Sequence, residues 1–498
     1  MSRRRALSLP VAAVLLAAGV IAVNGATSAG ASPSKVALWE SIAVPSGLHP
    51  GAMALLTDGS VMVQDQGATQ SGAPGWWLLT PNDKGSYADG SWRRVASLPA
   101  GYGPVSFASA VLPDGRFIVE GGEDNLGDTN AFTNRGAIYQ PLTNRWTPVA
   151  PPKGRQWKTI GDAPGVVLAD GTFMLGGSGN YTNATQALLD PGTLRWTITG
   201  THKVENNEEE GFTLLPDDEV LAVGLEPKAG RAELYHPSTG KWTGAGTIPV
   251  PLTDQLEIGP QVLRPDGTVL VTGDTGHNAV FHVASGTWSK GPDFPLIDGR
   301  RPHSADGPAA VLPDGDVLID ASPGIYKPPS YFFVFNGTTL SRVTGPPNAA
   351  TLESNWGYML VLPTGQVLFN DRIGDLALYN GGGAAKAAWR PVVTSVTGTI
   401  APNGTYPISG RQLNGVTEGA SYGDDYQSAT NYPLVRLTYS GSGRVVYART
   451  FAMSSMAVTP DVASHASFQV PGDAPAGAAS LVVVASGIAS EPVAVTVS

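Results

Sequence analysis

The chain contains no cysteine among its 498 residues. This absence excludes disulfides, thiolate metal ligands, nucleophilic cysteine chemistry and any thioether cross-link between a cysteine and a tyrosine. The fold must therefore be stabilised by packing alone. A chain of this length can achieve that, because the buried share of the surface rises with size.

Charged residues are also scarce, at 14% of the chain, whereas glycine and proline number 62 and 41. Glycine and proline interrupt helices, and long helices need charged faces toward solvent, so this composition predicts many short strands joined by tight turns. The net charge is −10, which leaves no surplus of basic residues. Nucleic acid and anionic membrane surfaces are therefore not expected as partners.

Beyond the first residues, no apolar stretch approaches the roughly 20 residues that a membrane span requires. The N-terminal segment has three arginines by Arg5, a mostly apolar run from Ala6 to Val23, and small residues ending at Ala31. These are the three parts of a secretory signal peptide. We therefore predict a signal peptide over residues 1–31, cleavage near Ala31 and a secreted protein without a membrane span. A retained membrane anchor is the alternative.

A turn between two apolar runs recurs seven times along the chain. The turns centre on Asp58-Gly59, Asp114-Gly115, Asp170-Gly171, Asp217-Asp218, Asp266-Gly267, Asp314-Gly315 and Thr364-Gly365. Their second residues lie 56, 56, 47, 49, 48 and 50 residues apart. Asp-Gly between two apolar runs is a strong hairpin signal, because both turn positions favour a left-handed backbone.

A tryptophan follows most of these turns. It lies at Trp92, Trp146, Trp196, Trp242, Trp288 and Trp389, while the sixth copy has Phe332 to Phe335 instead. Seven four-stranded units with a period near 50 are typical of a kelch-type β-propeller, which we predict over residues 32–390. We expect Trp39 to begin a strand that pairs into the last blade, because an open ring would leave unpaired strand edges.

The repeat stops after Trp389. Residues 391–498 contain short alternations of apolar and polar residues, such as Val435 to Tyr439, separated by glycine and proline. This pattern predicts a separate immunoglobulin-like β-sandwich. The whole protein is therefore predicted to be all-β.

Kelch blades followed by such a domain resemble the galactose oxidase and glyoxal oxidase family. The resemblance is strongest over residues 422–437, with the sequence YGDDYQSATNYPLVRL, and over VYART at residues 446–450. It implies a site with one copper ion, two tyrosines, two histidines and a cysteine cross-linked to one tyrosine. Most of these groups precede the innermost strands of particular blades.

The positions that correspond to those groups hold other residues in this chain. Ser106 falls at the cysteine, Asp162 at the cross-linked tyrosine and Asn355-Trp356 at a Tyr-His pair. The last histidine belongs to the C-terminal domain, where His465 is the only candidate. Serine, aspartate and asparagine hold copper poorly, and the cross-linked cofactor needs a thiol. Copper is therefore not expected, and copper radical oxidase activity is the least favoured function.

Each blade offers one residue at the start of its innermost strand, eight to ten residues before the second turn position. These residues are His49, Ser106, Asp162, Glu210, Glu257, Asp306 and Asn355. In a propeller such positions meet around the axis on one face, so we predict a binding site at an axial mouth. Two neighbours complete the predicted site: His303 as an acid or base beside Asp306, and Trp356 as a ring that stacks on a sugar.

Four of these residues are carboxylates in adjacent blades: Asp162, Glu210, Glu257 and Asp306. They suit a hard cation such as Ca²⁺ or Mg²⁺, or a sugar-binding or active site. The alternative is that they are unconnected polar residues on well-solvated loops. The leading hypothesis is a monomeric secreted protein that binds extracellular carbohydrate or another small polar ligand. A carboxylate-based hydrolase or lyase and a structural envelope protein are the alternatives, and no catalytic residue is assigned.

Overall fold

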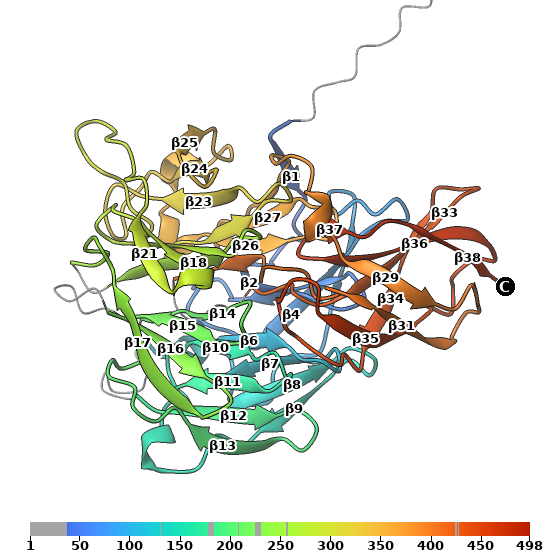
Figure 1. Ribbon diagram of the computed structural model, residues 1–498, viewed down its shortest axis with the longest axis horizontal. Helices are drawn as coiled ribbons and strands as arrows, with labels where there is room; N and C mark the ends of the chain where they lie inside the picture. The colour runs from blue at the N-terminus through green and yellow to red at the C-terminus, as the bar shows by residue number, and fades with distance from the viewer. Residues whose placement is uncertain are drawn as a thin grey trace, which may run out of the picture. The chain divides into compact units, whose positions relative to one another are not determined.

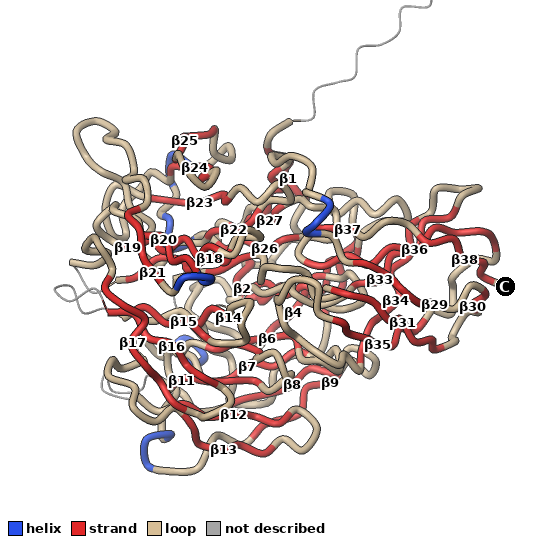
Figure 2. Tube along the Cα trace, viewed as in Figure 1, coloured by secondary structure: helices blue, strands red, loops and turns tan. Residues whose placement is uncertain are grey.

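The computed structural model describes residues 37–129, 131–177, 184–207, 209–224, 231–254, 257–423, 426 and 428–498. Strands dominate it, and the helices are single short turns (Figure 2). These turns are η1 (Asn125–Gly127), η2 (Arg155–Trp157), η3 (Val283–Ser285), η4 (Ala349–Thr351), η5 (Ser354–Trp356) and η6 (Ala387–Trp389). No helix within these described ranges has the length and apolar character to cross a membrane. The predicted signal peptide lies outside them.

Antiparallel four-stranded sheets form the blades (Figure 1). Blade 1 contains β2 (Pro50–Leu55), β3 (Val61–Asp65), β4 (Gly75–Thr80) and β5 (Ser91–Arg94). Blade 2 contains β6 (Ala108–Val111), β7 (Phe117–Glu120), β8 (Gly136–Gln140) and β9 (Arg145–Val149). Blade 3 contains β10 (Gly165–Val167), β11 (Phe173–Gly176), β12 (Gln186–Asp190) and β13 (Arg195–Thr199).

The remaining blades continue the same order from innermost to outermost strand. Blade 4 contains β14 (Phe212–Leu214), β15 (Val220–Val223), β16 (Arg231–His236) and β17 (Lys241–Thr247). Blade 5 contains β18 (Ile258–Leu263), β19 (Thr268–Gly273), β20 (Ala279–His282) and β21 (Thr287–Lys290). Blade 6 contains β22 (Ala309–Val311), β23 (Val317–Ala321), β24 (Tyr331–Phe335) and β25 (Leu340–Val343). Blade 7 contains β26 (Tyr358–Val361), β27 (Val367–Asn370), β28 (Leu376–Tyr379) and β1 (Trp39–Ile42).

The two inner strands of each blade are buried between neighbouring blades, which explains their nearly continuous apolar sequences. β3 is buried at every position, whereas β5 at the rim is mostly exposed. The predicted hairpin turns join the two inner strands of each blade. In blade 1, Gly59 adopts a φ of 78° and its N–H donates to the Leu56 carbonyl at 3.0 Å. The predicted all-β, seven-bladed propeller is confirmed.

The ring closes through β1, which pairs antiparallel with β28 and places Trp39 opposite Tyr379. The Trp39 indole donates to the Thr344 carbonyl of blade 6 at 2.7 Å. A tryptophan indole makes the same kind of hydrogen bond to the preceding blade elsewhere in the ring: Trp146 of blade 2 donates to the Ala96 carbonyl at 2.8 Å. The grouping of Trp389 with these tryptophans is corrected. Trp389 lies in η6, because Trp39 already fills that role in blade 7.

The C-terminal strands form a β-sandwich, drawn orange to red in Figure 1. They are β29 (Val392–Val396), β30 (Thr399–Ile400), β31 (Thr405–Arg411), β33 (Leu434–Tyr439), β34 (Val445–Phe451), β35 (Ala463–Gln469), β36 (Gly477–Ala485), β37 (Ile488–Ala489) and β38 (Val493–Val497). β34 joins the two sheets, because its first half pairs with β33 and its second half with β35. The sandwich contacts the hairpin-turn side of the propeller, where the Met453 N–H donates to the Pro113 carbonyl at 3.1 Å.

One segment of the C-terminal region enters the propeller axis. We call residues 417–423 the axial segment. Its strand β32 (Ala420–Ser421) pairs with β22, the innermost strand of blade 6. The Thr417 hydroxyl donates to the Leu263 carbonyl at 2.6 Å, and the Leu214 N–H donates to Glu418 Oε2 at 3.0 Å. Innermost strands have an unpaired edge, so the axial segment satisfies backbone groups that would otherwise lack partners.

Candidate binding site at the axial mouth

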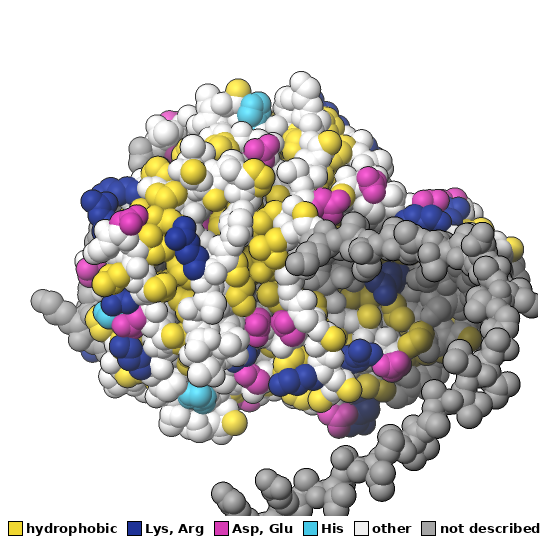
Figure 3. Space-filling view, turned by 90° about the horizontal axis from the view of Figure 1, so that it is seen from above, with side chains coloured by type: hydrophobic (Ala, Val, Ile, Leu, Met, Phe, Trp, Pro, Cys, Tyr) yellow, Lys and Arg dark blue, Asp and Glu magenta, His cyan; other side chains and the backbone are white. Residues whose placement is uncertain are grey.

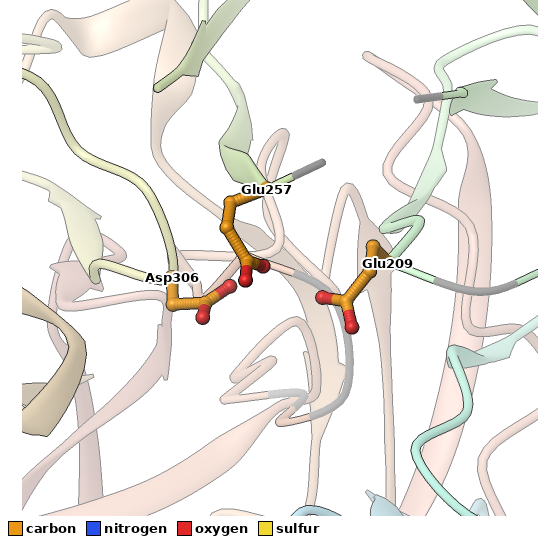
Figure 4. Close-up of side chains that lie close together, drawn as sticks. All are labelled: Glu209, Glu257 and Asp306. Atoms are coloured by element: carbon orange, nitrogen blue, oxygen red, sulfur yellow. The ribbon is translucent and has the colours of Figure 1, made fainter. Parts of the chain in front are cut away.

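The mouth is the end of the axis at which the innermost strands begin. Glu209, Glu257 and Asp306 precede β14, β18 and β22 and lie in three successive blades. One carboxylate oxygen from each lies within 4.8 Å of the others, and all three residues are partly exposed. Figure 4 shows the three side chains directed toward a common space. Three acids therefore share one opening.

Two of the three acids, Glu209 and Asp306, have an unusual backbone conformation. Glu209 and Asp306 adopt left-handed φ angles of 52° and 46°, and Ser106 in blade 2 does the same at 47°. Each stands nine residues before the second turn residue of its blade, since 218 − 209, 315 − 306 and 115 − 106 all equal nine. Such a backbone costs about 1–3 kcal/mol for a residue other than glycine and persists only where its surroundings hold it. The Asp306 N–H, for example, donates to the Ile258 carbonyl at 2.9 Å.

Tyr326 completes the mouth and was not among the predicted residues. Its hydroxyl donates toward Glu257 Oε1 at 3.2 Å and lies 3.4 Å from Asp306 Oδ2. Partial burial and the two neighbouring carboxylates raise the pKa of Tyr326 above its ordinary value, so its proton is retained. Tyr326 lies in the connection between β23 and β24, the second and third strands of blade 6. The corresponding connections of the other blades vary in length and sequence, so the repeat gave no signal for this residue.

Glu210 does not join this group, which corrects the expected position of that side chain. It is 1% exposed, and its Oε2 lies 2.8 Å from the Nζ of Lys203. The same ammonium lies 3.3 Å from Oε2 of Glu233. Burial raises the pKa of Glu210 to about 7, and Lys203 opposes that rise. In blade 4 the side chain at the mouth is therefore that of Glu209, which has a left-handed backbone, and the next residue, Glu210, is buried.

Two predicted residues lie in other surroundings. Asp162 is partly exposed in blade 3, but the described acids that group closely enough to share an ion do not include it. His49 belongs to a network in blade 1, where its Nδ1 lies 3.9 Å from Asp65 Oδ1. Asp65 also accepts from the Trp77 indole at 3.5 Å. Of the four predicted carboxylates, the structure therefore brings together Glu257 and Asp306 only.

Tyr422 in the axial segment and Tyr426 just after it contact two further predicted residues. The Tyr422 hydroxyl donates to the Asn355 carbonyl at 2.7 Å, beside a partly exposed Trp356. Tyr426 accepts from the Ser106 N–H at 2.6 Å. Thus Asn355 and Ser106 contribute backbone groups that fix the C-terminal region at the axis.

His303 is buried at 5% exposure rather than open to the mouth. The backbone N–H of His303 donates to the Ser322 carbonyl at 2.9 Å, and the ring Nδ1 accepts from the Ala305 N–H at 3.4 Å. Burial lowers the pKa of His303 to about 4, so the ring is neutral at physiological pH. A neutral, enclosed imidazole is better placed to fix the backbone before Asp306 than to exchange protons with a ligand.

The donor set of the mouth can be compared with what metals prefer. The three grouped residues offer carboxylate oxygens, and Tyr326 adds a phenol. His465 lies exposed on β35 in the sandwich. Such oxygen donors do not fit copper, which favours imidazole and sulfur ligands. They fit Ca²⁺ or Mg²⁺, because ligands of one Ca²⁺ at 2.3–2.6 Å can lie about 5 Å apart.

Comparisons with known proteins bear on the fold. No family model matches the chain, and no curated protein matches it. Among solved structures, a fungal alcohol oxidase of the AA5 family in complex with copper aligns with 93% of this chain and 100% of its own. The identity is 15% and the TM-score 0.53. The structure of YjhT aligns with 61% of this chain and 99% of its own, at 16% identity and a TM-score of 0.42.

These observations define the class of protein. The chain has a seven-bladed propeller and a C-terminal β-sandwich with a segment in the axis, and it shares its fold with an AA5 alcohol oxidase. The resemblance to galactose oxidase-like proteins is confirmed for the fold. Fold alone does not carry activity, so function must be argued from the mouth.

Proposed function

We propose that the protein is a secreted carbohydrate-binding protein whose ligand binds at the acidic axial mouth, without copper redox chemistry. The observation that carries the proposal is the meeting of Glu209, Glu257 and Asp306 with the Tyr326 hydroxyl. Secretion is supported by the basic, apolar and small-residue segments at the start of the chain.

The chemistry of the mouth suits a polyhydroxy ligand. Ionised carboxylates accept hydrogen bonds from hydroxyl donors, and such charge-assisted bonds are roughly twice as strong as neutral ones. Three acceptor groups from three blades can engage several hydroxyls of one sugar ring. The partly exposed Trp356 supplies an apolar face beside them.

Anions are disfavoured at the mouth, because they would meet three carboxylates. On the coloured part of the face in Figure 3, basic and acidic side chains are interspersed among polar and apolar ones. Recognition of a neutral sugar at the mouth therefore fits the local charge better than recognition of an acidic one.

A second candidate function is glycoside hydrolysis by a pair of the mouth carboxylates. Retaining glycosidases place their two carboxyl groups about 5–5.5 Å apart. One oxygen each of Glu209, Glu257 and Asp306 lies within 4.8 Å of the others. This short separation favours a retaining mechanism over an inverting one, which needs a wider gap between the carboxyl groups. Release of reducing ends from bound oligosaccharides would distinguish hydrolysis from binding.

The test is a glycan array of neutral and acidic oligosaccharides, followed by calorimetry with the best neutral ligand. The Glu257→Gln, Asp306→Asn double variant should lose binding by about tenfold or more, because each acid loses a charge-assisted bond. Glu491→Gln is the matched control, since that acid is exposed and lies far along the chain in the sandwich. Absence of any neutral sugar ligand, or equal affinity in the double variant, would contradict the proposal.

Addition of a chelator separates direct binding from binding through a cation. If Ca²⁺ or Mg²⁺ bridges the carboxylates to the sugar, a chelator abolishes binding and the metal restores it. If the carboxylates bind the hydroxyls directly, affinity is unchanged. Either result keeps the ligand at the mouth, provided that the double variant is impaired.

A further inference from the structure

A polar cleft of about 680 Å³ lies on the outer side of the propeller between blades 5 and 6. Its walls are the outer strands of blade 5, the turn between β24 and β25, and the connection that leads from blade 7 to the sandwich. Asn336 and Thr338 come from the turn, and Lys386 comes from the connection. The volume falls within the range of about 300–1,000 Å³ that is typical of small-ligand sites.

This cleft is separate from the mouth. Arg264 lines the cleft and directly follows β18, whereas Glu257 directly precedes that strand. The six residues of β18 span about 20 Å, at about 3.3 Å per residue. A ligand in the cleft therefore does not contact the carboxylates of the mouth.

The charge of the cleft is opposite to that of the whole chain. Arg264, Lys290 and Lys386 line it with three cations, and Asp266 is the anion beside them. Asp266 Oδ2 lies 2.6 Å from Arg264 Nη1, so that pair is locally balanced. Lys290 Nζ lies 3.3 Å from Oδ2 of Asp293, an acid that also pairs with Arg301 at 3.7 Å. Counted against Asp266 and Asp293, the three cations leave an excess of one positive charge at the cleft, in a chain whose net charge is −10.

Contacts with neighbouring residues hold several of the side chains that line the cleft. The Arg264 side chain is 9% exposed, its Nε donates to the Gly315 carbonyl at 3.0 Å, and its guanidinium lies 5.3 Å from the centre of the Phe335 ring. Lys386 Nζ lies 4.5 Å from the centre of the Trp389 ring, which holds the end of that side chain. In the same cleft, Ser289 shares a hydrogen bond of 2.8 Å with His282.

We propose that this cleft binds an anionic oligosaccharide, and that it is a second carbohydrate site independent of the mouth. The ligand's carboxylate or sulfate groups pair with Lys290 and Lys386, and its hydroxyls bond to Ser289, Asn336 and Thr338. The mouth repels such a ligand and the cleft attracts it, so the two sites select sugars of different charge. Together they would let one molecule engage two kinds of chain in an extracellular polymer.

The experiment is calorimetry of the full chain with tetragalacturonate, with a heparin-derived tetrasaccharide as the sulfated arm and maltotetraose as the neutral one. Binding of either anionic probe supports the proposal and identifies the anionic group preferred. Affinity should fall by at least about tenfold in the Lys290→Met, Lys386→Met double variant, because two charge-assisted contacts are lost. It should also fall at about 0.5 M salt, where screening shortens the range of the charges to a few ångströms.

Two matched controls make the test specific. Lys153→Met removes an exposed lysine from another part of the propeller and should bind the anionic probe like the wild type. Glu257→Gln with Asp306→Asn should also keep that binding, even if it loses neutral sugar, so failure at one site is distinguishable from failure at the other. No binding of either anionic probe, or undiminished binding by the double lysine variant, would overturn the proposal.

Discussion

Glu418 offers a quantitative test of how the axial segment is held in the propeller. Its side chain is 8% exposed, and its Oε2 accepts the backbone N–H of Leu214 at 3.0 Å. Burial raises the pKa of this carboxyl from 4.5 to about 8, and the Leu214 bond opposes that rise. The folded protein therefore holds a protonated acid at neutral pH, whereas the unfolded chain releases that proton near pH 4.5.

The sign and the size of the effect follow from this difference. A folded-state pKa above the unfolded one means that stability is fully present below about pH 4.5 and is lost as the pH rises toward 8. Each pKa unit corresponds to about 1.36 kcal/mol. The 3.5 units between 4.5 and 8 therefore amount to a loss that approaches about 5 kcal/mol above pH 8.

Glu418→Gln should remove this dependence, because an amide of the same shape still accepts from Leu214 and does not ionise. We expect the free energy of unfolding of the variant, minus that of the wild type, to rise by about 4 kcal/mol between pH 5 and pH 8. Urea unfolding followed by tryptophan fluorescence at both pH values measures it. Glu491→Gln, at an acid that is 80% exposed, is the control and should show no such change. An equal difference at both pH values would refute the assignment of Glu418 as a buried, protonated acid.

Other predictions concern the core and the mouth. Lys203→Met should lower the free energy of unfolding by about 3–5 kcal/mol, because it leaves Glu210 and Glu233 buried without their cation. Thermal unfolding measures this effect, with Lys153→Met as the control. Equal unfolding midpoints for the two variants would contradict the stabilising role of the Lys203 ammonium. Gly423→Ala should weaken sugar binding while the fold stays intact, because its Cβ would lie 3.1 Å from the Asp306 Cα. Titration of that variant with a neutral oligosaccharide tests this, and unchanged affinity would show that the axial segment does not position the mouth.

Much of the fold could be predicted because its signals are local. Asp58-Gly59 and its counterparts mark each hairpin, and the buried inner strands give continuous apolar runs that recur with the period of a blade. Trp39 before the first turn likewise indicated the strand that closes the ring. Each of these features needs only neighbouring residues to be interpreted.

The site could be predicted only in part, because its remaining features depend on register and on contacts between distant segments. A shift of one residue separates Glu209 at the mouth from Glu210 in the core, and the distance from the mouth residue to the hairpin turn is not constant, since it is nine residues for Asp306 and ten for Glu257. Tyr326 lies in a connection between the second and third strands whose length and sequence vary from blade to blade. Glu418 belongs to a segment whose sequence gives no indication that it enters the propeller axis beside β14 and β22, which lie more than 100 residues earlier in the chain.

The most direct test of the proposed function is calorimetry with a neutral oligosaccharide selected on the array. It compares the wild type with the Glu257→Gln, Asp306→Asn double variant and with Glu491→Gln. We predict that the wild type and Glu491→Gln bind alike and that the double variant loses at least about tenfold in affinity. Equal affinities in all three proteins would place the sugar away from the mouth and contradict the account.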